Sequence, residues 1–241
     1  MIMSPIESNL QQIRRETNAA IAGLPPDRRQ NITIVAVSKT MPASAVREAV
    51  NAGQRDFGEN YVQEGVAKIA ELSDLGRHGE ESVAWHFIGP LQSNKAKLVA
   101  EHFDWVHGVD RLKIAEMLSR TRESADIGDS MRPLNICMQV NVSGEASKSG
   151  LKPDEAVTLA QQVVVLPGLR LRGLMTIIEN TPDIGAQRAQ FRQLRDCQLQ
   201  LLNAGLAVDT LSMGMSQDFK VAIAEGATMI RIGSAIFGPR H

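Results

Sequence analysis

A lysine at the end of an apolar segment is the residue in this chain with the clearest chemistry. Lys39 follows residues 32–38, which read Ile-Thr-Ile-Val-Ala-Val-Ser. This composition predicts a strand buried on both faces in a parallel sheet. At the exit of such a strand, desolvation disfavours the charged amine and leaves a nucleophile that can attack a carbonyl carbon. The alternative is a lysine whose charged end extends to solvent.

Two small-residue segments near the C-terminus could hold a phosphate. Residues 212–216 read Ser-Met-Gly-Met-Ser, and residues 233–234 read Gly-Ser. Small residues let backbone N–H groups approach phosphate oxygens, and barrels often bind phosphate after strands seven and eight. Each segment alone is equally typical of a turn. Together with Lys39 they predict a site for an aldehyde that also carries a phosphate, which fits pyridoxal 5'-phosphate.

Several further side chains are candidates with an open alternative. Arg231 should share a strand face with Gly233 because side chains alternate along a strand, although it could instead pair with an interior carboxylate. His86 is either a ligand contact or a histidine with its hydrogen bonds satisfied in the interior. Lys148 is either a secondary contact or part of a solvated turn. Glu59 is expected to pair with Lys39 or with another buried base.

Strand-like and helix-like segments alternate along the chain. The expected strands are 32–39, 55–59, 84–89, 105–109, 134–142, 169–177, 210–213 and 229–237. The expected helices between them are 42–52, 61–75, 93–102, 111–123, 153–165, 185–204 and 217–225. Eight such units predict a single (β/α)8 TIM barrel. A doubly wound open sheet is the competing fold, but residues 38–42 lack the glycines of a dinucleotide-binding turn.

We expect the whole chain, 1–241, to form one domain, because no change of composition marks a linker. Residues 1–22 predict an extra amphipathic helix packed on the outside of the barrel. Arg14, Arg15 and Glu16 interrupt its apolar side, so it is expected to be neither a signal peptide nor a membrane span.

Composition argues against nucleic acid and membrane as partners. The net charge is -1 and aromatic residues make up 4% of the chain, which offers neither a basic surface nor a stacking platform. The two cysteines, Cys137 and Cys197, match no metal-ligand spacing, so no metal is expected. Their separation fits a reducing compartment, and we expect a cytoplasmic protein.

Six ordered motifs resemble the pyridoxal phosphate homeostasis protein family, also called the YggS family. They cover about residues 32–240. They are Ala-Val-Ser-Lys-Thr at 36–40, Phe-Gly-Glu-Asn-Tyr at 57–61, His-Phe-Ile-Gly-Pro-Leu-Gln-Ser-Asn-Lys at 86–95, Gly-Leu-Met-Thr at 173–176, Leu-Ser-Met-Gly-Met-Ser at 211–216 and Arg-Ile-Gly-Ser-Ala-Ile-Phe-Gly at 231–238.

The resemblance implies a barrel like the N-terminal domain of alanine racemase, fold type III among enzymes that use pyridoxal phosphate. It implies that Lys39 carries the cofactor as an internal aldimine. The other implied cofactor contacts are Asn60 beside the ring, Met175, Ser212 and Met213 with Gly233 and Ser234 at the phosphate, and Arg231 near the pyridine nitrogen. Lys148 matches a lysine of the family's Ser-Lys-Ser-Gly loop. Met41 stands where many bacterial members have a second lysine.

The family is implicated in intracellular vitamin B6 and amino-acid balance, without an established turnover. The resemblance therefore implies a monomeric cofactor-binding protein that buffers pyridoxal phosphate and delivers it to apo-enzymes. An amino-acid racemase is the alternative, and a Schiff-base aldolase is a weaker one. Racemisation needs a base on each face of the bound substrate. We expect the racemase domain that supplies the second base to be missing, with Tyr61 the only internal substitute.

Overall fold

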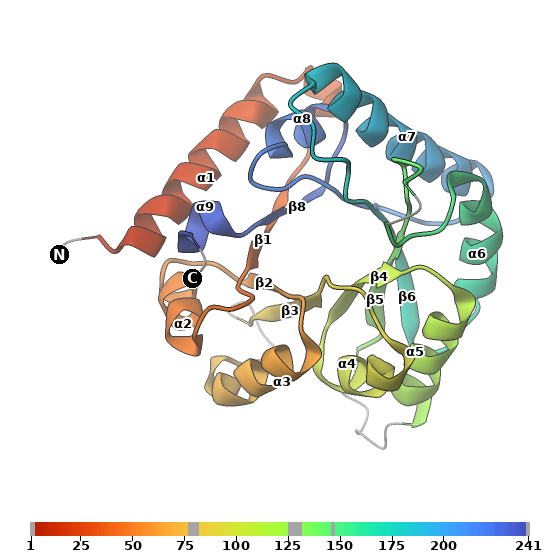
Figure 1. The fold of residues 1–241 in the computed structure, drawn as a ribbon, viewed down its shortest axis with the longest axis horizontal. Coiled ribbons are helices and arrows are strands. Elements are labelled where there is room, and N and C mark those ends of the chain that lie inside the picture. The colour runs from red at the N-terminus through yellow and green to blue at the C-terminus, as the bar shows by residue number, and fades with distance from the viewer. Residues whose placement is uncertain (1–2, 77–81, 125–131, 146–147, 240–241) are drawn as a thin grey trace.

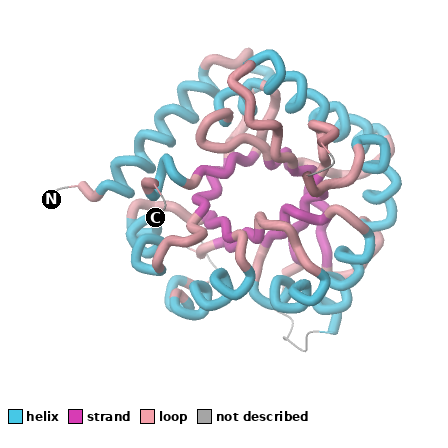
Figure 2. The backbone as a smooth tube through the Cα atoms, viewed as in Figure 1, coloured by secondary structure: helices cyan, strands magenta, loops and turns pink. Residues whose placement is uncertain are grey.

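The strands close into a parallel barrel. The computed structural model describes residues 3–76, 82–124, 132–145 and 148–239, and within these ranges the eight strands pair in sequence order (Figure 1). Strands β1 and β8 close the ring, in register from Thr33 with Met229 to Ala36 with Ile232. Figure 2 shows the ring of strands surrounded by helices. The predicted (β/α)8 barrel is confirmed, and the open doubly wound sheet was the wrong alternative.

The bounds of the elements follow the expected order with shorter strands. The strands are β1 Thr33–Val37, β2 Asp56–Glu59, β3 Ala84–Phe87, β4 Trp105–Val109, β5 Leu134–Gln139, β6 Leu169–Met175, β7 Thr210–Ser212 and β8 Met229–Ile232. The α-helices are α1 Pro5–Ala22, α2 Ala43–Asn51, α3 Val62–Glu71, α4 Ala96–His102, α5 Leu112–Ser124, α6 Ala156–Val163, α7 Ile184–Asn203, α8 Phe219–Ala224 and α9 Ser234–Phe237. Short 3-10 helices cover Pro26–Arg28, Ser73–Leu75, Ser93–Lys95 and Pro153–Glu155.

Alternate residues of each strand face the helices or the barrel interior. On β3, Trp85 and Phe87 belong to the apolar cluster that packs strands against helices. His86 lies between them and is fully buried without belonging to that cluster, which places it on the interior side. On β8 the same alternation puts Ile232 in the cluster and Arg231 in the interior. The apolar core therefore lies outside the ring of strands, and the interior carries polar side chains.

Helix α1 fills the outer position beside the seam between β1 and β8. Ser4 caps it by accepting a hydrogen bond from the Glu7 N–H at 3.1 Å. Leu10 and Ile13 are buried on its inner side, and the helix packs against α2, α8 and α9 (Figure 1). The predicted N-terminal helix on the outside of the barrel is confirmed, with its start at Pro5.

The last strand is shorter than the sequence predicted. The segment 229–237 was expected to be one strand, but β8 ends at Ile232 and helix α9 begins at Ser234. A short apolar run does not distinguish strand from helix. Tertiary packing favours the helix, because the Ile236 carbonyl accepts a hydrogen bond from Asn9 of α1 at 2.9 Å. Ser234 therefore lies in a helical turn rather than on a strand.

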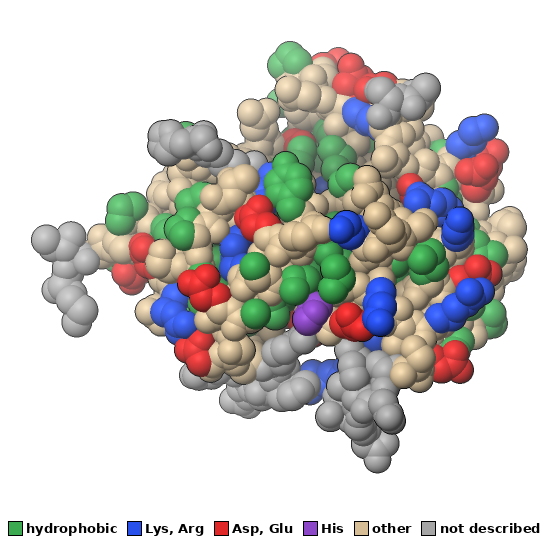
Figure 3. All heavy atoms as spheres, turned by 60° about the horizontal axis from the view of Figure 1, so that its bottom comes forward, with side chains coloured by type: hydrophobic (Ala, Val, Ile, Leu, Met, Phe, Trp, Pro, Cys, Tyr) green, Lys and Arg blue, Asp and Glu red, His purple; other side chains and the backbone are tan. Residues whose placement is uncertain are grey.

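Charge is spread over the visible surface rather than gathered by sign. On the face in Figure 3, acidic and basic side chains are interspersed. Among the described residues, no helix combines the length and hydropathy that a membrane crossing requires.

We expect Leu10→Ala to lower the free energy of unfolding by about 2–5 kcal/mol, because it opens a cavity under α1. Leu10 is fully buried, whereas Ser8 on the same helix is exposed. Ser8→Ala is therefore the control and should change stability by less than about 0.5 kcal/mol. Urea unfolding curves measure both. Equal stability of the two variants would mean that α1 does not fold as part of the barrel.

Candidate functional site

A cavity of about 430 Å³ opens at the carboxyl ends of the strands. Five residues singled out from the sequence line it, namely Lys39, Asn60, Arg231, Gly233 and Ser234. They come from the ends of β1, β2 and β8, which is where barrels place their sites. Because β1 and β8 are paired neighbours, segments from the two ends of the chain form one wall of the cavity.

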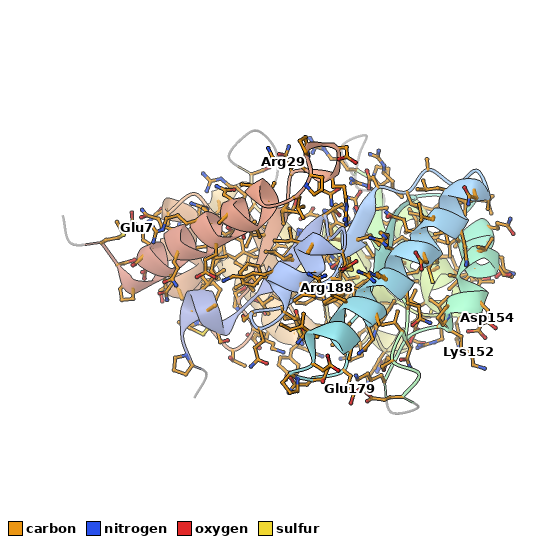
Figure 4. All side chains as sticks on the ribbon, turned by 90° about the horizontal axis from the view of Figure 1, so that it is seen from above. Glu7, Arg29, Lys152, Asp154, Glu179 and Arg188 are labelled. Carbon is orange, nitrogen blue, oxygen red and sulfur yellow. The ribbon has the colours of Figure 1, made fainter. Side chains whose placement is uncertain are left out.

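The sequence did not predict two other parts of the wall. Residues 177–180 and 217–218 line the cavity, as does Ile88, whereas Met215 and Ser216, which also line it, belong to the candidate phosphate segment 212–216. Figure 4 shows Glu179 at the end of the molecule opposite Arg29, which precedes β1. Both segments directly follow β6 and β7, so extending the strand-exit argument by a few residues would have found them.

Lys39 occupies the corner of a strained turn. The Met41 N–H donates to the Ser38 carbonyl at 3.0 Å, which makes residues 38–41 a β-turn with Lys39 as its second residue. Thr40, the third residue, has φ of 66°, and it is the only non-glycine with positive φ among the described residues. A β-branched residue there costs free energy and persists only where its surroundings impose it.

A buried ion-pair cluster imposes this turn. Lys68 donates to the Ser38 carbonyl at 2.8 Å and pairs with Glu59 at 2.6 Å and Glu64 at 3.1 Å. The Glu64 carboxylate also accepts the Thr40 N–H at 2.5 Å. The backbone is thus held on both sides of Lys39. Glu59 pairs with Lys68, so the second alternative stated for it is confirmed. Burial raises the pKa of Glu59, although the Lys68 charge acts in the opposite direction.

Lys68 was not found from the sequence, although its position carried a signal. With Val62, Gly65 and Ile69 it occupies one face of α3 at helical spacing. That face is buried, and Lys68 is 5% exposed. A lysine on an apolar helix face predicts a buried charge with an acidic partner.

Arg231 is held by backbone and hydroxyl oxygens rather than by the carboxylate that the sequence left as an alternative. Its Nη1 donates to the carbonyl and the hydroxyl of Ser212, both at 2.7 Å. Its Nη2 donates to the Thr176 carbonyl at 2.8 Å. Burial lowers the pKa of Arg231 to about 10, so the guanidinium stays charged at neutral pH.

His86 lies in the barrel interior, where its hydrogen bonds are made within the protein. Its Nε2 is 3.0 Å from Asp56 Oδ1, and its Nδ1 is 3.0 Å from Nε2 of His107. His107 Nδ1 is 2.9 Å from the Ser212 hydroxyl. His86 is therefore an interior histidine with a hydrogen-bond partner at each ring nitrogen, which was the second alternative. Burial is the main cause that lowers the pKa of His107 well below its ordinary value.

The remaining candidates are not among the described residues that line the cavity. Met175, Ser212 and Met213 are almost completely buried. The Ser212 hydroxyl accepts a hydrogen bond from Arg231 and lies 2.9 Å from His107 Nδ1. Lys148 pairs with Glu145 at 3.0 Å in the loop after β5. Residue type alone does not show whether a side chain lines the cavity, because it does not show which way the side chain faces.

The cavity wall fits a ligand that combines an aldehyde, a hydrogen-bond donor and a phosphate. Lys39 brings an amine and Arg231 a cation. Asn60 Oδ1 is buried and has no hydrogen-bond partner among the described groups, which suits a ligand donor. Asn60 is fixed by a close backbone approach, since a Cβ on Gly89 would lie 2.4 Å from the Asn60 carbonyl oxygen. Gly233 and Ser234 supply backbone N–H groups at the start of a helical turn.

Sequence comparison identifies the family. The model for the alanine racemase N-terminal domain matches residues 6–241. A pyridoxal phosphate homeostasis protein of Pseudomonas aeruginosa is 53% identical over 99% of this chain and 97% of its own length. The corresponding Escherichia coli protein is 50% identical over 99% of this chain and 98% of its own. The chain belongs to the pyridoxal phosphate homeostasis protein family.

Solved structures agree with this family and with the fold. PipY of Synechococcus elongatus, with pyridoxal phosphate bound, is 40% identical with a TM-score of 0.80, over 97% of this chain and 100% of that one. Alanine racemase of Corynebacterium glutamicum is 14% identical with a TM-score of 0.68, over 97% of this chain and 60% of that one. The second likeness shows the fold alone. It confirms the predicted fold, a barrel like the N-terminal domain of alanine racemase.

We expect Lys68→Met to lower the free energy of unfolding by about 3–5 kcal/mol, because it leaves Glu59 and Glu64 without their buried cation. Lys97→Met is the matched control. The Lys97 side chain is 77% exposed and lies 3.8 Å from Glu101, so its loss should change stability by less than about 0.5 kcal/mol. Urea unfolding at pH 7 measures the difference. A loss for Lys68→Met as small as the control's would show that the cluster does not stabilise the turn around Lys39.

Proposed function

We propose that this protein binds pyridoxal 5'-phosphate covalently through Lys39 and buffers its supply, as one domain of residues 1–241. The observation that carries the proposal is the presence of Lys39, Arg231 and the Gly233–Ser234 turn in one cavity at the strand ends. PipY, a relative of known structure, is similar over 97% of this chain and has this cofactor bound.

Each group of the cavity wall has a distinct role in this proposal. When bound, pyridoxal phosphate brings an aldehyde that bonds to a primary amine, a pyridine nitrogen and a phosphate. Lys39 Nζ is the amine, fixed in place by the turn at residues 38–41. The N–H groups at Gly233 and Ser234 would hold the phosphate. Arg231 would lie near the ring nitrogen, where its charge would disfavour protonation of that nitrogen and weaken the ring as an electron sink.

Exchange of the cofactor with its surroundings requires an open cavity. Ile177 and Met215 line the cavity, yet they are 39% and 38% exposed, so the wall reaches the surface between them. We infer that this opening lets bound cofactor leave for apo-enzymes that use it, while Lys39 and the cavity floor remain rigid.

The remaining proposals concern the state of the protein in the cell. Cys137 and Cys197 are both free and buried, and burial raises their pKa to about 12 and about 11. Inert thiols of this kind suit a cytoplasmic protein, which we propose it to be. We also propose that it is a monomer, as the resemblance to the family implies.

Replacing Lys39 tests the proposed attachment. We expect the protein mixed with pyridoxal phosphate to absorb visible light, and borohydride followed by peptide mass analysis to place the adduct on the peptide that contains Lys39. Lys39→Ala should lose both signals, whereas Lys97→Ala, with its exposed side chain, should keep them. A label of undiminished yield in Lys39→Ala would overturn the proposal.

We propose further that the protein is a binder and not a racemase. Racemisation needs a second base opposite Lys39. Tyr61, the only tyrosine of the chain, is 55% exposed and is not among the described residues lining the cavity. The acidic residues of the wall are Glu179 and Asp218, and Asp218 already accepts the Met215 N–H at 2.5 Å.

Loss of the α-deuteron from labelled amino acids measures this directly. We expect the cofactor-loaded protein to release deuterium far more slowly than about 1 per second, the lower range of ordinary turnover. Lys39→Ala gives the background rate. Deuterium loss at about 1 per second or faster from any of the labelled amino acids tested would show that the protein is an enzyme and not a carrier.

A further inference from the structure

A continuous hydrogen-bonded chain crosses the interior of the barrel. It runs from Arg231 through Ser212, His107 and His86 to Asp56, with successive distances of 2.7, 2.9, 3.0 and 3.0 Å. Ser212, His107 and His86 are fully buried. Interiors of such barrels are usually filled by branched apolar side chains. Polar groups at this depth are stable only when each finds a partner, as these do.

The chain joins two hollows on opposite ends of the barrel. Arg231 lines the cavity at the carboxyl ends of the strands. Asp56 stands at the first residue of β2 and lines a hollow of about 550 Å³ beside α1. The Asp56 side chain is 30% exposed and therefore meets solvent. An exposed carboxylate at one end is thus linked to a buried cation at the other.

The two ends fix the direction of every bond between them. Arg231 can only donate, so the Ser212 oxygen accepts from it, and an ionised Asp56 can only accept, so His86 Nε2 donates to it. A neutral His86 then has a bare Nδ1, which must accept from Nε2 of His107. A neutral His107 in turn has a bare Nδ1, which accepts the Ser212 O–H. With both rings neutral, a single set of hydrogen positions therefore makes all four bonds.

We propose that His107 and His86 are positioning residues for Arg231, locked in one tautomer by Asp56 at the far end of the barrel. Ser212 is held with its hydrogen toward His107 and its lone pair toward Arg231. The Arg231 guanidinium, gripped at Nη1 by Ser212 and at Nη2 by Thr176, keeps its place in the cavity wall. The expected effect of these histidines on ligand affinity rests on the proposed function. The expected tautomers of His86 and His107 do not depend on it.

Protonation of His86 would reverse the chain. One added proton gives His86 two N–H groups, so His86 Nδ1 donates to His107 and His107 Nδ1 donates to Ser212. The Ser212 oxygen would then face two donors, and its own hydrogen would lose its acceptor in a buried place. Trp105 stacks on His86, and the ionisable groups around the two rings are Asp56 of β2, Cys137 of β5, Arg172 of β6 with its partner Asp209, and Arg231 of β8.

Nitrogen NMR of 15N-histidine-labelled protein without added cofactor tests the lock. We expect bare Nδ1 and protonated Nε2 on both His86 and His107 in the wild type, with the His107 signals assigned by their loss in His107→Asn. Asp56→Leu should disturb the tautomer of His107 as well as that of His86, because leucine offers no acceptor to the His86 Nε2–H and the hydrogen-bonded chain loses its acceptor-only end. Asp209→Leu is the control, since Asp209 pairs with Arg172 on β6 and is 59% exposed.

Two results would overturn the proposal, namely a protonated Nδ1 on wild-type His107, or a His107 spectrum unchanged by Asp56→Leu.

Titration with pyridoxal phosphate measures the consequence for binding. We expect His107→Leu to weaken affinity about tenfold, the equivalent of one hydrogen bond, and His107→Asn, which keeps an acceptor for Ser212, to recover most of it. Equal and undiminished affinity in both variants would refute the positioning role. If the wild type did not bind pyridoxal phosphate, only the proposed function would be refuted. The tautomers measured by NMR would still show whether Asp56 sets the direction of the hydrogen bonds.

Discussion

The pairing of β1 with β8 is the constraint on which the site depends. It brings Val35 opposite Arg231 and thereby sets the end of the first strand beside the end of the last. Lys39 and the Gly233–Ser234 turn share a cavity only because this seam is closed. Helix α1 covers the seam from outside, and its contact with α9 ties the turn after β8 to the start of the chain. A feature that looks like an N-terminal addition is thus part of the support for the cavity.

Two different kinds of polar contact support the two basic residues of the cavity, Lys39 and Arg231. Around Lys39 the support is ionic and acts on the backbone, through Lys68, Glu59 and Glu64. Burying these charges is costly, and the arrangement is favourable only because each charge has a close partner. Around Arg231 the support is a chain of neutral donors and acceptors, which avoids adding a second buried cation beside the guanidinium. The first arrangement can impose strain on Thr40, whereas the second fixes direction without strain.

Sequence reasoning reached the fold and the centre of the site because both follow from local patterns. Strand exits are readable from apolar runs, so Lys39, Asn60 and Arg231 could be placed at the cavity in advance. Sequence reasoning could not tell which residues at the end of a strand face the cavity and which face the barrel interior. Ser212 looked like a phosphate contact by type, but its register on β7 turns it toward His107. It failed also at α9, where contact with α1 decided between helix and strand.

The same limit explains why the interior chain escaped prediction. His86 and His107 lie on strands whose apolar neighbours dominate the pattern, and Asp56 is at the start of its strand, at the end of the barrel away from the expected ligand. These three residues lie on β2, β3 and β4. The stagger of neighbouring strands in the closed barrel brings their side chains within hydrogen-bond distance of one another. Once they meet, their hydrogens are no longer independent, because a donor-only group stands at one end and an acceptor-only group at the other. The position of Arg231 in the cavity can therefore depend on the Asp56 carboxylate at the opposite end of the barrel. This dependence follows from how the strands are arranged and cannot be read from any one strand.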